Sequence, residues 1–521
     1  MPHAIYLASS VSLTCFLDNH SRRLVGNSQA EKISLRSYGQ AGKMASQITV
    51  SIWIFLLLLA ITGWAVLDRI MIPSVRWFLR RRINRVLDEI GSRLDIEIRP
   101  FQLTKRQVLI DRLVYDPKVI ESMQAHAQET GTPREVVQAE IQGYAKEIVP
   151  SFNAYLYFRI AYWLAKKVAR SLYWVRIGLF SDDQYVSVNP DSTVVFVMNH
   201  RSNMDYILLA FLAAERTTLS YAVGEWAKIW PLQTLIKAMG AYFVRRNSGN
   251  PLYRLVLERY INMATKEGVC QAVFLEGRLS RDGRLQQPKL GFVDYMLRSF
   301  EPETDRDIVF IPVGLNYDRT LEDRTLLRAL DPTAKKRNIF FVTKTTIWFI
   351  CRNLWLMARN KWQRFGYACV NFGPPISAQE YCREHDFTFS RLDRKSRFSE
   401  VEKLCKGLMA SIEQIVPVLP VSLVATVFLE DTEEWLSEFD VKAYVHRLIE
   451  ELQSKGAPVY LSKRSGEHTI TTALNMLKLR RLVVASDGLL RAERESLGVL
   501  SYYANAIDYW RQHQPTSTSE G

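Results

Sequence analysis

Short apolar runs alternate with segments of helical period between residues 190 and 377. The runs are rich in β-branched and aromatic residues and lie at 193–198, 219–223, 241–244, 271–275, 308–315, 339–343 and 367–372. Apolar residues recur with helical period between several of these runs, at 204–214, 226–238 and 251–266. Near-continuous apolar strands that alternate with helices indicate a sheet covered on both faces. The pattern therefore predicts an α/β domain with a mostly parallel central sheet flanked by helices.

Helix-like segments lie on both sides of this domain. The region from about 117 to 150 is polar and helix-like, whereas residues 152–180 and 344–366 mix aromatic residues with Arg and Lys. This mixture is typical of a helix half-sunk in a membrane interface, although an amphipathic helix of a soluble body gives the same pattern. Toward the C-terminus, segments of helical period lie at 398–416, 433–455, 469–482 and 487–511.

An uncharged segment of 19 residues, Thr49 to Leu67, is long enough to cross a membrane. At about 1.5 Å per residue it spans about 28 Å, close to the roughly 30 Å of a hydrocarbon core. Trp53 and Trp64 lie near its ends, and a run of arginines follows it, which places the C-terminal body in the cytosol. A cleaved signal peptide or a buried core helix would be the alternatives. Residues 70–93 form a basic amphipathic stretch that suits the inner leaflet.

Residues 1–43 are polar, rich in Ser and without sustained periodicity. They are predicted to be disordered, a targeting segment, or an over-extended start upstream of Met44. The predicted organisation has N-terminal transmembrane and interfacial helices and a C-terminal helical region around the α/β domain. Its parts are a polar start (1–43), a transmembrane anchor (44–69), a basic amphipathic helical region at the membrane surface (70–189), the α/β domain (190–377), a C-terminal helical domain (378–511) and a disordered tail (512–521).

Composition narrows the choice of partners. The 521 residues include 68 Lys and Arg against 54 Asp and Glu, a net charge of +14 that favours anionic partners. No nucleic-acid-binding motif is present, so lipid headgroups or phosphorylated substrates fit better than nucleic acid. The six cysteines have no metal-ligand spacing and are predicted to be reduced, mostly buried thiols, and no metal is predicted.

The segment 196–212 holds the candidate catalytic pair. His200 follows an apolar strand-like run and Asp205 stands five residues later, where a helix-like run begins. Open α/β sheets place their chemistry at such strand–loop–helix turns, and His with an orienting carboxylate is the usual general base near neutral pH. The sequence from Ser202 to Asp205 also reads as a capping box, so Asp205 could serve only the start of a helix.

Three further strand ends carry charged residues. Gly240 to Arg246 ends one apolar run with two arginines, Phe274 to Leu285 ends another with glycines, a carboxylate and three arginines, and Ile311 to Arg319 ends a third. Singly, each cluster reads as a solvated loop. Together beside His200 they would form a cationic cup, because guanidinium groups bind phosphate in pairs of hydrogen bonds and glycine lets the backbone approach a ligand.

In this order the four segments resemble the glycerolipid acyltransferase family, and within it the membrane-bound glycerol-3-phosphate acyltransferases. The family's HRSxMDY block matches His200 to Tyr206, GAFFIRR matches Gly240 to Arg246 with two mild changes, and Ile311 to Tyr317 resembles the Pro-centred fourth block. In the EGxRSRxGRL block, the matches are Glu276, Gly277, Ser280, Arg281, Gly283, Arg284 and Leu285. The family has Arg where this chain has Leu279, while Arg278 stands one place earlier.

The resemblance implies an enzyme that moves a fatty acyl group from an acyl thioester to glycerol 3-phosphate. His200 would be the general base, Asp205 would orient it, and Asn203 is a candidate for holding the oxyanion. The implied substrate-binding residues are Arg245, Arg246, Glu276, Gly277, Arg278, Ser280, Arg281, Arg284 and Pro312. Glu276 and Ser280 would bind the acceptor's hydroxyls or order the loop. No G-x-S-x-G nucleophile elbow is present.

The implied acyl donor is acyl-CoA or acyl carrier protein, with no bound cofactor, and membrane phospholipids are the expected surroundings. The expected location is the inner membrane of a bacterial cell, with the catalytic body on the cytosolic side. Acylation of dihydroxyacetone phosphate or of a lysophospholipid is the alternative within the same class. A non-catalytic membrane protein that binds lipid or phosphate is the alternative outside it.

Overall fold

The computed structural model describes residues 32–34, 49–51, 62, 99–154, 156–178, 188–213, 218–224, 232–245, 248–331, 352, 359, 364–461 and 466–512. The chain divides into two compact units, 1–84 and 85–521. In the first unit, strand β1 (Lys32–Ser34) pairs antiparallel with β2 (Thr49–Ser51). The second unit contains the sheet, its covering helices and the C-terminal region.

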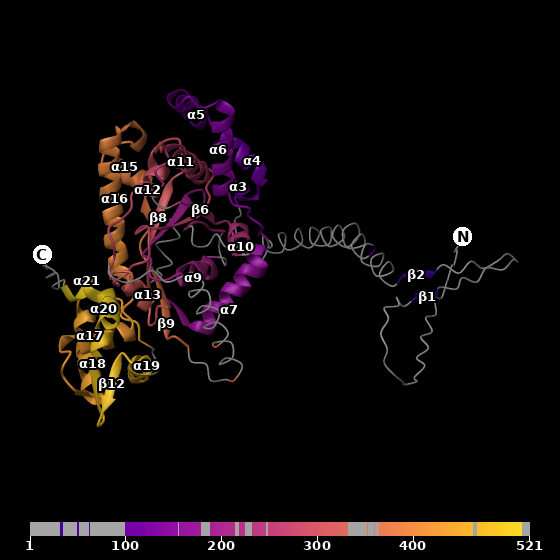
Figure 1. Ribbon diagram of the computed structural model, residues 1–521. Helices are drawn as coiled ribbons and strands as arrows, with labels where there is room; N and C mark the ends of the chain where they lie inside the picture. Colours follow the sequence, from indigo (N-terminus) through magenta and orange to yellow (C-terminus); the bar gives the residue numbers. More distant parts are fainter. Residues whose placement is uncertain are drawn as a thin grey trace, which may run out of the picture. The chain divides into compact units, whose positions relative to one another are not determined.

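The second unit is built on one central sheet in the order β3-β9-β8-β4-β7-β5-β6, with β10 beside β8. Figure 1 labels β6, β8 and β9 of this sheet. The strands are β3 (Trp174–Gly178), β4 (Thr193–Met198), β5 (Ser220–Gly224), β6 (Tyr242–Val244), β7 (Gln271–Phe274), β8 (Ile308–Tyr317), β9 (Tyr367–Phe372) and β10 (Ile376–Ser377). The five strands from β8 to β6 are parallel, and β9 and β10 run antiparallel to β8. The predicted α/β class with a mostly parallel sheet is confirmed.

Helices cover both faces of the sheet, which explains why central strands such as β4 are apolar along most of their length. The helices around the sheet are η2 (Leu156–Ala161, π-helical), α7 (Tyr162–Leu172), α9 (Met204–Ala213), α10 (Leu232–Ala238), α11 (Pro251–Lys266), α12 (Gly291–Leu297) and α13 (Asp323–Arg328). On β4, Val195 and Val197 point into a core shared with α11 and α12, whereas Met198 belongs to a second core with α7 and α9. Alternation along a strand sends neighbouring side chains to opposite faces.

Helix α11 shows how local sequence sets these elements. Asn250 precedes it and accepts a hydrogen bond from the Tyr253 backbone N–H at 3.0 Å, and Pro251 occupies the first helical position. An Asn cap satisfies one of the free N–H groups of a helix start, and proline needs no partner there. The predicted helix at 251–266 is confirmed.

The N-terminal part of this unit is helical, with α3 (Pro100–Leu103), α4 (Arg106–Val114), α5 (Pro117–Thr130) and α6 (Arg134–Ile148). Its buried residues join the core of α11. The sequence prediction for 152–180 is only half right, because the helix ends at Leu172 and strand β3 follows, pairing with β9. The sheet therefore begins before residue 190, as a half-exposed strand whose pattern lacks a continuous apolar run.

The C-terminal region is not wholly helical. It contains α15 (Ala378–Glu384), η4 (Phe389–Arg391), α16 (Arg394–Ile415), α17 (Pro420–Glu430), α18 (Glu438–Ser454), α19 (Gly466–Leu479), η5 (Arg494–Ser496), α20 (Leu497–Ala504), η6 (Asn505–Ile507) and α21 (Asp508–Gln512), with strands β11 (Leu436–Ser437), β12 (Val483–Ser486) and β13 (Leu489–Ala492). Asp487 and Gly488 both have positive φ and join β12 to β13, so an Asp-Gly hairpin turn replaces the predicted helix there.

A separate core forms from α17 onward, between Val418 and Ile507, whereas α16 packs into the core of the sheet domain. This separate core begins at Val418, inside the predicted C-terminal helical domain of 378–511. We call residues 418–512 the C-terminal unit; it is a part of the second compact unit, 85–521. In Figure 1 its helices α20 and α21 lie beside the lower end of α16.

No helix within the described ranges is long and apolar enough to cross a membrane. Most of the predicted span at 49–67 lies outside those ranges; Thr49–Ser51 are extended in β2 rather than helical, and Thr62 is helical. Also outside are the 70–93 stretch, the strand at 339–343, nearly all of 344–363, and the tail after Gln512. Cys270, Cys369, Cys382 and Cys405 are buried and form no disulfide, whereas Cys15 and Cys351 fall outside the described ranges.

Candidate active site

His200 lies at the carboxyl end of β4, two residues after the strand ends at Met198. Helix α9 begins at Met204, whose backbone N–H donates to the Ser202 hydroxyl at 3.1 Å. The strand, loop and helix therefore follow one another as the sequence predicts. The neighbours of β4 in the sheet are β7 and β8, so the loops that leave these two strands flank His200 at the same edge.

His200 and Asp205 form a buried pair. The Nδ1 atom of His200 lies 2.8 Å from an oxygen of Asp205, and the two residues are 2% and 0% exposed. The imidazole stacks on Phe274, with the ring centroids 4.0 Å apart. In a neutral imidazole that donates from Nδ1 to this carboxylate, the Nε2 atom carries the lone pair that can accept a proton from a substrate.

Four hydrogen bonds fix the Asp205 carboxylate. One oxygen accepts from the backbone N–H groups of Arg201 and Ser202, at 2.8 and 3.1 Å, in addition to facing His200. The other accepts from the Tyr317 hydroxyl at 2.6 Å. Burial and the nearby Asp205 charge raise the pKa of Tyr317 well above its usual value, which keeps this hydroxyl a donor. Asp205 therefore contacts both the loop at the start of α9 and the His200 ring.

The loop after β7 forms hydrogen bonds with both the backbone N–H and the backbone carbonyl of His200. The buried Glu276 carboxylate accepts from the His200 N–H at 2.8 Å and from the Gln286 N–H at 3.1 Å. The backbone N–H of Ser280 donates to the His200 carbonyl at 2.8 Å. Burial raises the pKa of Glu276 to about 8. Glu276 and Ser280 were expected either to bind the acceptor's hydroxyls or to order the loop. Their backbone contacts are those of residues that order the loop.

Three arginines of this loop reach the surface. Arg278 and Arg281 are exposed, and within the described ranges the hydrogen bond of Arg281 is a long one, 3.5 Å, to the Ala329 carbonyl. Arg284 is bound to Asp508 at 3.0 Å. Gly277 has a φ of +69° at the turn before them, a conformation that glycine adopts without strain. Arg278 and Arg281 are therefore the guanidinium groups nearest in sequence to Glu276 that are open to a phosphate.

Arg245 lies apart from this group. It follows β6, which is three strand positions from β4, a distance of about 14 Å at the usual strand spacing. Its guanidinium pairs with Glu147 at 2.6 Å and lies over the rings of Tyr144 and Tyr253. The expectation that all three basic strand ends meet at His200 is thus not met for β6, because the sheet order inserts β7 and β5 between them. Arg246 lies outside the described residues.

Pro312 lies inside β8, opposite Val197, rather than at the end of the strand. It stands between the part of β8 that pairs with β10 and the part that pairs with β9, and its carbonyl accepts from Gly373 at 2.9 Å. Proline has no N–H to donate, so it fits a point where pairing passes from one neighbour to another. In this structure Pro312 therefore marks the point where the pairing of β8 changes from β10 to β9.

Asn203 forms hydrogen bonds with the carboxylate of Glu322, a residue that the sequence did not indicate. Its backbone N–H and its side-chain amide both donate to Glu322, at 3.3 and 3.0 Å, and the Ser202 hydroxyl donates to the same carboxylate at 2.8 Å. Burial raises the pKa of Glu322. The donors expected to hold an oxyanion therefore already have an acceptor, so Asn203 organises the loop in this structure.

Four residues that contact the His200–Asp205 pair or its loop were not singled out in the sequence: Tyr317, Glu322, Arg201 and Phe274. Tyr317 and Arg201 lie within the matched motifs, so their position in a motif was a usable signal. Glu322 lies 119 residues from Asn203 in sequence, beyond the last motif, and nothing local marks it.

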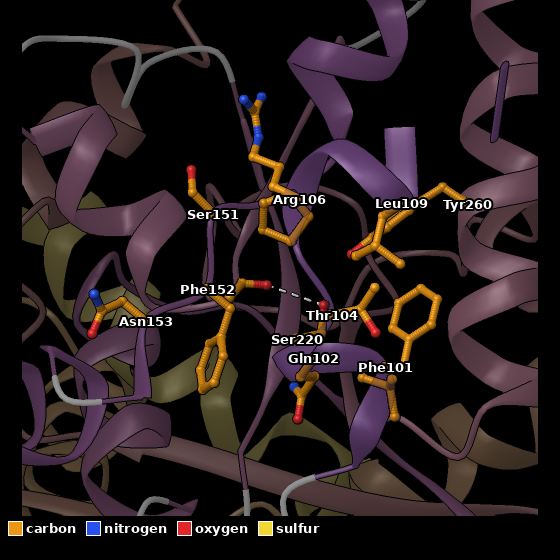
Figure 2. A pocket seen from close by; sticks show the side chains of 13 residues that line it. Phe101, Gln102, Thr104, Arg106, Leu109, Ser151, Phe152, Asn153, Ser220 and Tyr260 are labelled. Atoms are coloured by element: carbon orange, nitrogen blue, oxygen red, sulfur yellow. Dashed lines mark hydrogen bonds between the residues drawn. The ribbon is translucent and has the colours of Figure 1, made fainter. Parts of the chain in front are cut away.

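A separate cavity of about 160 Å³ lies at the opposite edge of the sheet, at the amino ends of β5, β6 and β7. Figure 2 shows its lining, which includes the aromatic residues Phe101, Phe152 and Tyr260 and the polar residues Gln102, Arg106 and Asn153. Arg106 already donates to the Val149 carbonyl at 3.0 Å. In the described part of the chain, no cluster of His, Cys, Asp and Glu could hold a metal ion. The His200 pair remains the candidate active site.

The fold and the site together define an α/β protein whose candidate centre is a buried histidine–carboxylate pair at the edge of a mostly parallel sheet. The family model described as "Acyltransferase" matches residues 181–316, and the model of the glycerol-3-phosphate acyltransferase C-terminal region matches residues 353–508. With the matched motifs, these two regions make the chain similar to the glycerolipid acyltransferases.

Relatives from several bacteria are each named glycerol-3-phosphate acyltransferase. Those of Xylella fastidiosa (strain M23) and Xanthomonas axonopodis pv. citri are 27% identical over 439 residues, or 82% of this chain. That of Pseudomonas paraeruginosa is 28% identical over 371 residues, or 69% of the chain. The matches cover 49%, 48% and 42% of the relatives' own lengths, so the chain spans about half of each.

One solved structure, the 1-acyl-sn-glycerophosphate (LPA) acyltransferase PlsC from Thermotoga maritima, matches 49% of this chain and 78% of its own. The sequence identity is 16% and the TM-score is 0.28, which is too low to establish a common fold.

Proposed function

We propose that this protein transfers a fatty acyl group from an acyl thioester to glycerol 3-phosphate, with lysophosphatidate as product. The observation that carries the proposal is the 2.8 Å contact between His200 Nδ1 and Asp205, buried beside a loop that exposes Arg278 and Arg281. A general base next to open guanidinium groups suits a phosphorylated alcohol. The names of the relatives support the same acceptor.

In the proposed mechanism, His200 Nε2 takes the proton from the acceptor's hydroxyl while the Asp205 carboxylate stabilises the imidazolium that forms. The acceptor oxygen attacks the thioester carbonyl, the carbon–sulfur bond breaks, and the proton passes to the departing thiolate. Arg281 and Arg278 bind the acceptor phosphate. Acyl-CoA or acyl carrier protein serves as the donor substrate, and the reaction needs no bound cofactor.

We also propose that the protein works at the inner membrane of a bacterial cell, with its catalytic body on the cytosolic side and phospholipid around it. Support comes from the segment η2–α7, where Ile160, Trp163 and Leu164 are exposed beside cationic side chains such as Lys167. Exposed apolar residues with flanking cations suit an anionic lipid surface.

The test is an assay of purified membranes with labelled glycerol 3-phosphate and both donor types. His200→Ala should lower kcat at least about 100-fold, because general-base catalysis contributes that much or more. His446→Ala, at an exposed position on α18, is the matched control and should retain wild-type turnover. Near-normal turnover by His200→Ala would refute the general-base role.

The alternative acceptors are resolved in the same assay. Faster acylation of dihydroxyacetone phosphate or of a lysophospholipid than of glycerol 3-phosphate would reassign the substrate. Absence of acyl transfer to every acceptor, with retained binding of phosphate or lipid, would favour a non-catalytic binding protein. The intact His200–Asp205 pair favours the enzyme.

A further inference from the structure

The C-terminal unit reaches the candidate active site through α20. Tyr502 is fully buried there, and its hydroxyl donates to the Arg201 carbonyl at 3.2 Å. Arg201 immediately follows His200, so a residue of the C-terminal unit holds the loop of the catalytic pair. The two bonded residues are 301 positions apart in sequence.

The Arg201 side chain makes the second connection. It is 3% exposed, its Nη1 donates to the Gly283 carbonyl at 2.6 Å, and its guanidinium carbon lies 5.1 Å from the centre of the Tyr502 ring. Its Nε and Nη2 atoms have no hydrogen-bond partner in the part of the chain that the structure describes. Because buried unpaired N–H groups cost stability, folding stability alone does not account for an arginine here.

Gly283 shows how closely α20 approaches the loop that carries Arg281. Its φ is +87°, and a Cβ atom at this position would lie 2.0 Å from the Tyr502 carbonyl oxygen. The Asn505 amide donates to the Asp282 carbonyl at 2.9 Å, and Asp508 binds Arg284. Residues 282, 283 and 284 of the loop at 280–284 therefore all contact the C-terminal unit.

The loop after β8 also contacts the C-terminal unit, through a hydrogen bond and an ion pair. The Thr320 backbone N–H donates to the Tyr503 hydroxyl at 3.1 Å, and Asp323 is paired with Arg480. Between these two points stands Glu322, which binds Ser202 and Asn203. Both loops that hold the His200 loop are thus held by the C-terminal unit.

We propose that the C-terminal unit is a working part of the active site, and that Tyr502 is a positioning residue that fixes the His200–Arg201 loop against the loop at 280–284. The Ser280 N–H donates to the His200 carbonyl, and Arg281 is the next residue, so one displacement would move both the base and the phosphate ligand. The catalytic consequence rests on the proposed function, whereas the loop ordering does not.

The first test measures loop order without activity. Hydrogen exchange in the full-length protein should become at least tenfold faster in peptides covering 199–206 and 278–286 when Tyr502→Phe removes the hydroxyl or Asn505→Ala removes the amide. Val445→Ala, in the core of the C-terminal unit on α18, is the matched control. It should lower the melting temperature and speed exchange within the C-terminal unit while leaving those two peptides unchanged.

The second test measures steady-state kinetics. Tyr502→Phe, which keeps the ring under Arg201, should raise the acceptor KM about threefold, and Tyr502→Leu should raise it at least tenfold, with the donor KM within twofold of wild type. Val445→Ala should leave both KM values unchanged.

Unchanged exchange in the 199–206 and 278–286 peptides of both Tyr502→Phe and Asn505→Ala would overturn the proposal. Equal changes in the Val445→Ala control would overturn it too, because loss of stability would then explain them. If no acceptor is acylated by the wild-type protein, the proposed function fails, while the exchange result still decides the role of Tyr502.

Discussion

Hydrogen bonds from four groups fix the position of the Asp205 carboxylate. The His200 ring and two backbone N–H groups meet one oxygen, and the Tyr317 hydroxyl meets the other at 2.6 Å. With both oxygens occupied, the carboxylate cannot rotate away from Nδ1 when His200 becomes charged. Preorganisation of this kind lowers the reorganisation that accompanies proton transfer.

Tyr317→Phe should therefore lower kcat about ten- to hundredfold, because a hydrogen bond to a charged group contributes roughly 1.5–3 kcal/mol. Steady-state kinetics at saturating donor and acceptor measure the effect. Tyr173→Phe is a matched control, since this buried tyrosine donates to the Arg319 carbonyl at 2.6 Å rather than to Asp205. If the two variants lose activity equally, the Tyr317 contact has no special role in catalysis.

The order of the strands decides which basic residues surround His200. Strands β7 and β8 flank β4, so their loops meet the His200 loop, whereas β6 forms the far edge of the sheet. Arg245, which follows β6, pairs with Glu147 from α6, and this hydrogen bond raises the pKa of the guanidinium. We infer that Arg245 joins α6 to the edge of the sheet, while the loop after β7 provides the phosphate ligands.

Arg281→Ala and Arg245→Gln should consequently have different effects. Loss of Arg281 should raise the KM for glycerol 3-phosphate about ten- to hundredfold and leave the donor KM unchanged, as expected for one charge-assisted hydrogen bond. Loss of Arg245 should leave the acceptor KM near wild type and lower stability by about 1 kcal/mol or less, because the ion pair is partly exposed. Initial rates and urea unfolding measure the two effects. A larger acceptor KM for Arg245→Gln than for Arg281→Ala would reverse the assignment.

The sheet and the C-terminal unit are joined through buried polar groups as well as apolar ones. Asp318, just after β8, accepts from the Tyr367 N–H at 2.7 Å on β9 and from the Val421 N–H at 3.0 Å on α17. Burial raises the pKa of Asp318 to about 7, and it raises that of Glu276 to about 8. Two carboxyl groups that titrate near neutral pH therefore lie where separate parts of the chain meet.

Stability should consequently fall as pH rises from about 5 to 8.5. Between the ordinary carboxyl pKa and the raised one, the folded protein binds more protons than the unfolded chain, so its advantage is complete at low pH and is lost as pH rises through the raised pKa. Each group contributes a slope of at most about 1.4 kcal/mol per pH unit. Urea unfolding at pH 5.5, 7 and 8.5 measures the slope.

Glu276→Gln and Asp318→Asn should each flatten this dependence, in different pH ranges, because neither amide titrates. The Asp318→Asn effect should be complete by about pH 7.5, and the Glu276→Gln effect should extend above pH 8. A wild-type stability that rises over this range would contradict the raised pKa of both groups.

Features set by neighbours in sequence could be predicted from the sequence. The apolar runs at 193–198 and 271–275 form strands, the segment at 251–266 forms a helix, and His200 meets Asp205 because only five residues separate them at a strand–loop–helix turn. The hairpin at Asp487–Gly488 was predictable too, since Asp-Gly favours this turn. The helical period of 487–511 instead predicted a helix that begins at this point.

Features set by distant parts of the chain needed the tertiary structure. The distance of Arg245 from His200 follows from strand order, which a period of apolar residues does not encode. The Tyr317–Asp205 and Tyr502–Arg201 contacts join residues 112 and 301 positions apart, through long-range packing. The sequence by itself determined that His200 meets Asp205 and which class the fold belongs to, because local patterns and short loops specify both. Only the tertiary structure decided which loops surround that pair and that the C-terminal unit holds them, because these depend on how whole elements pack.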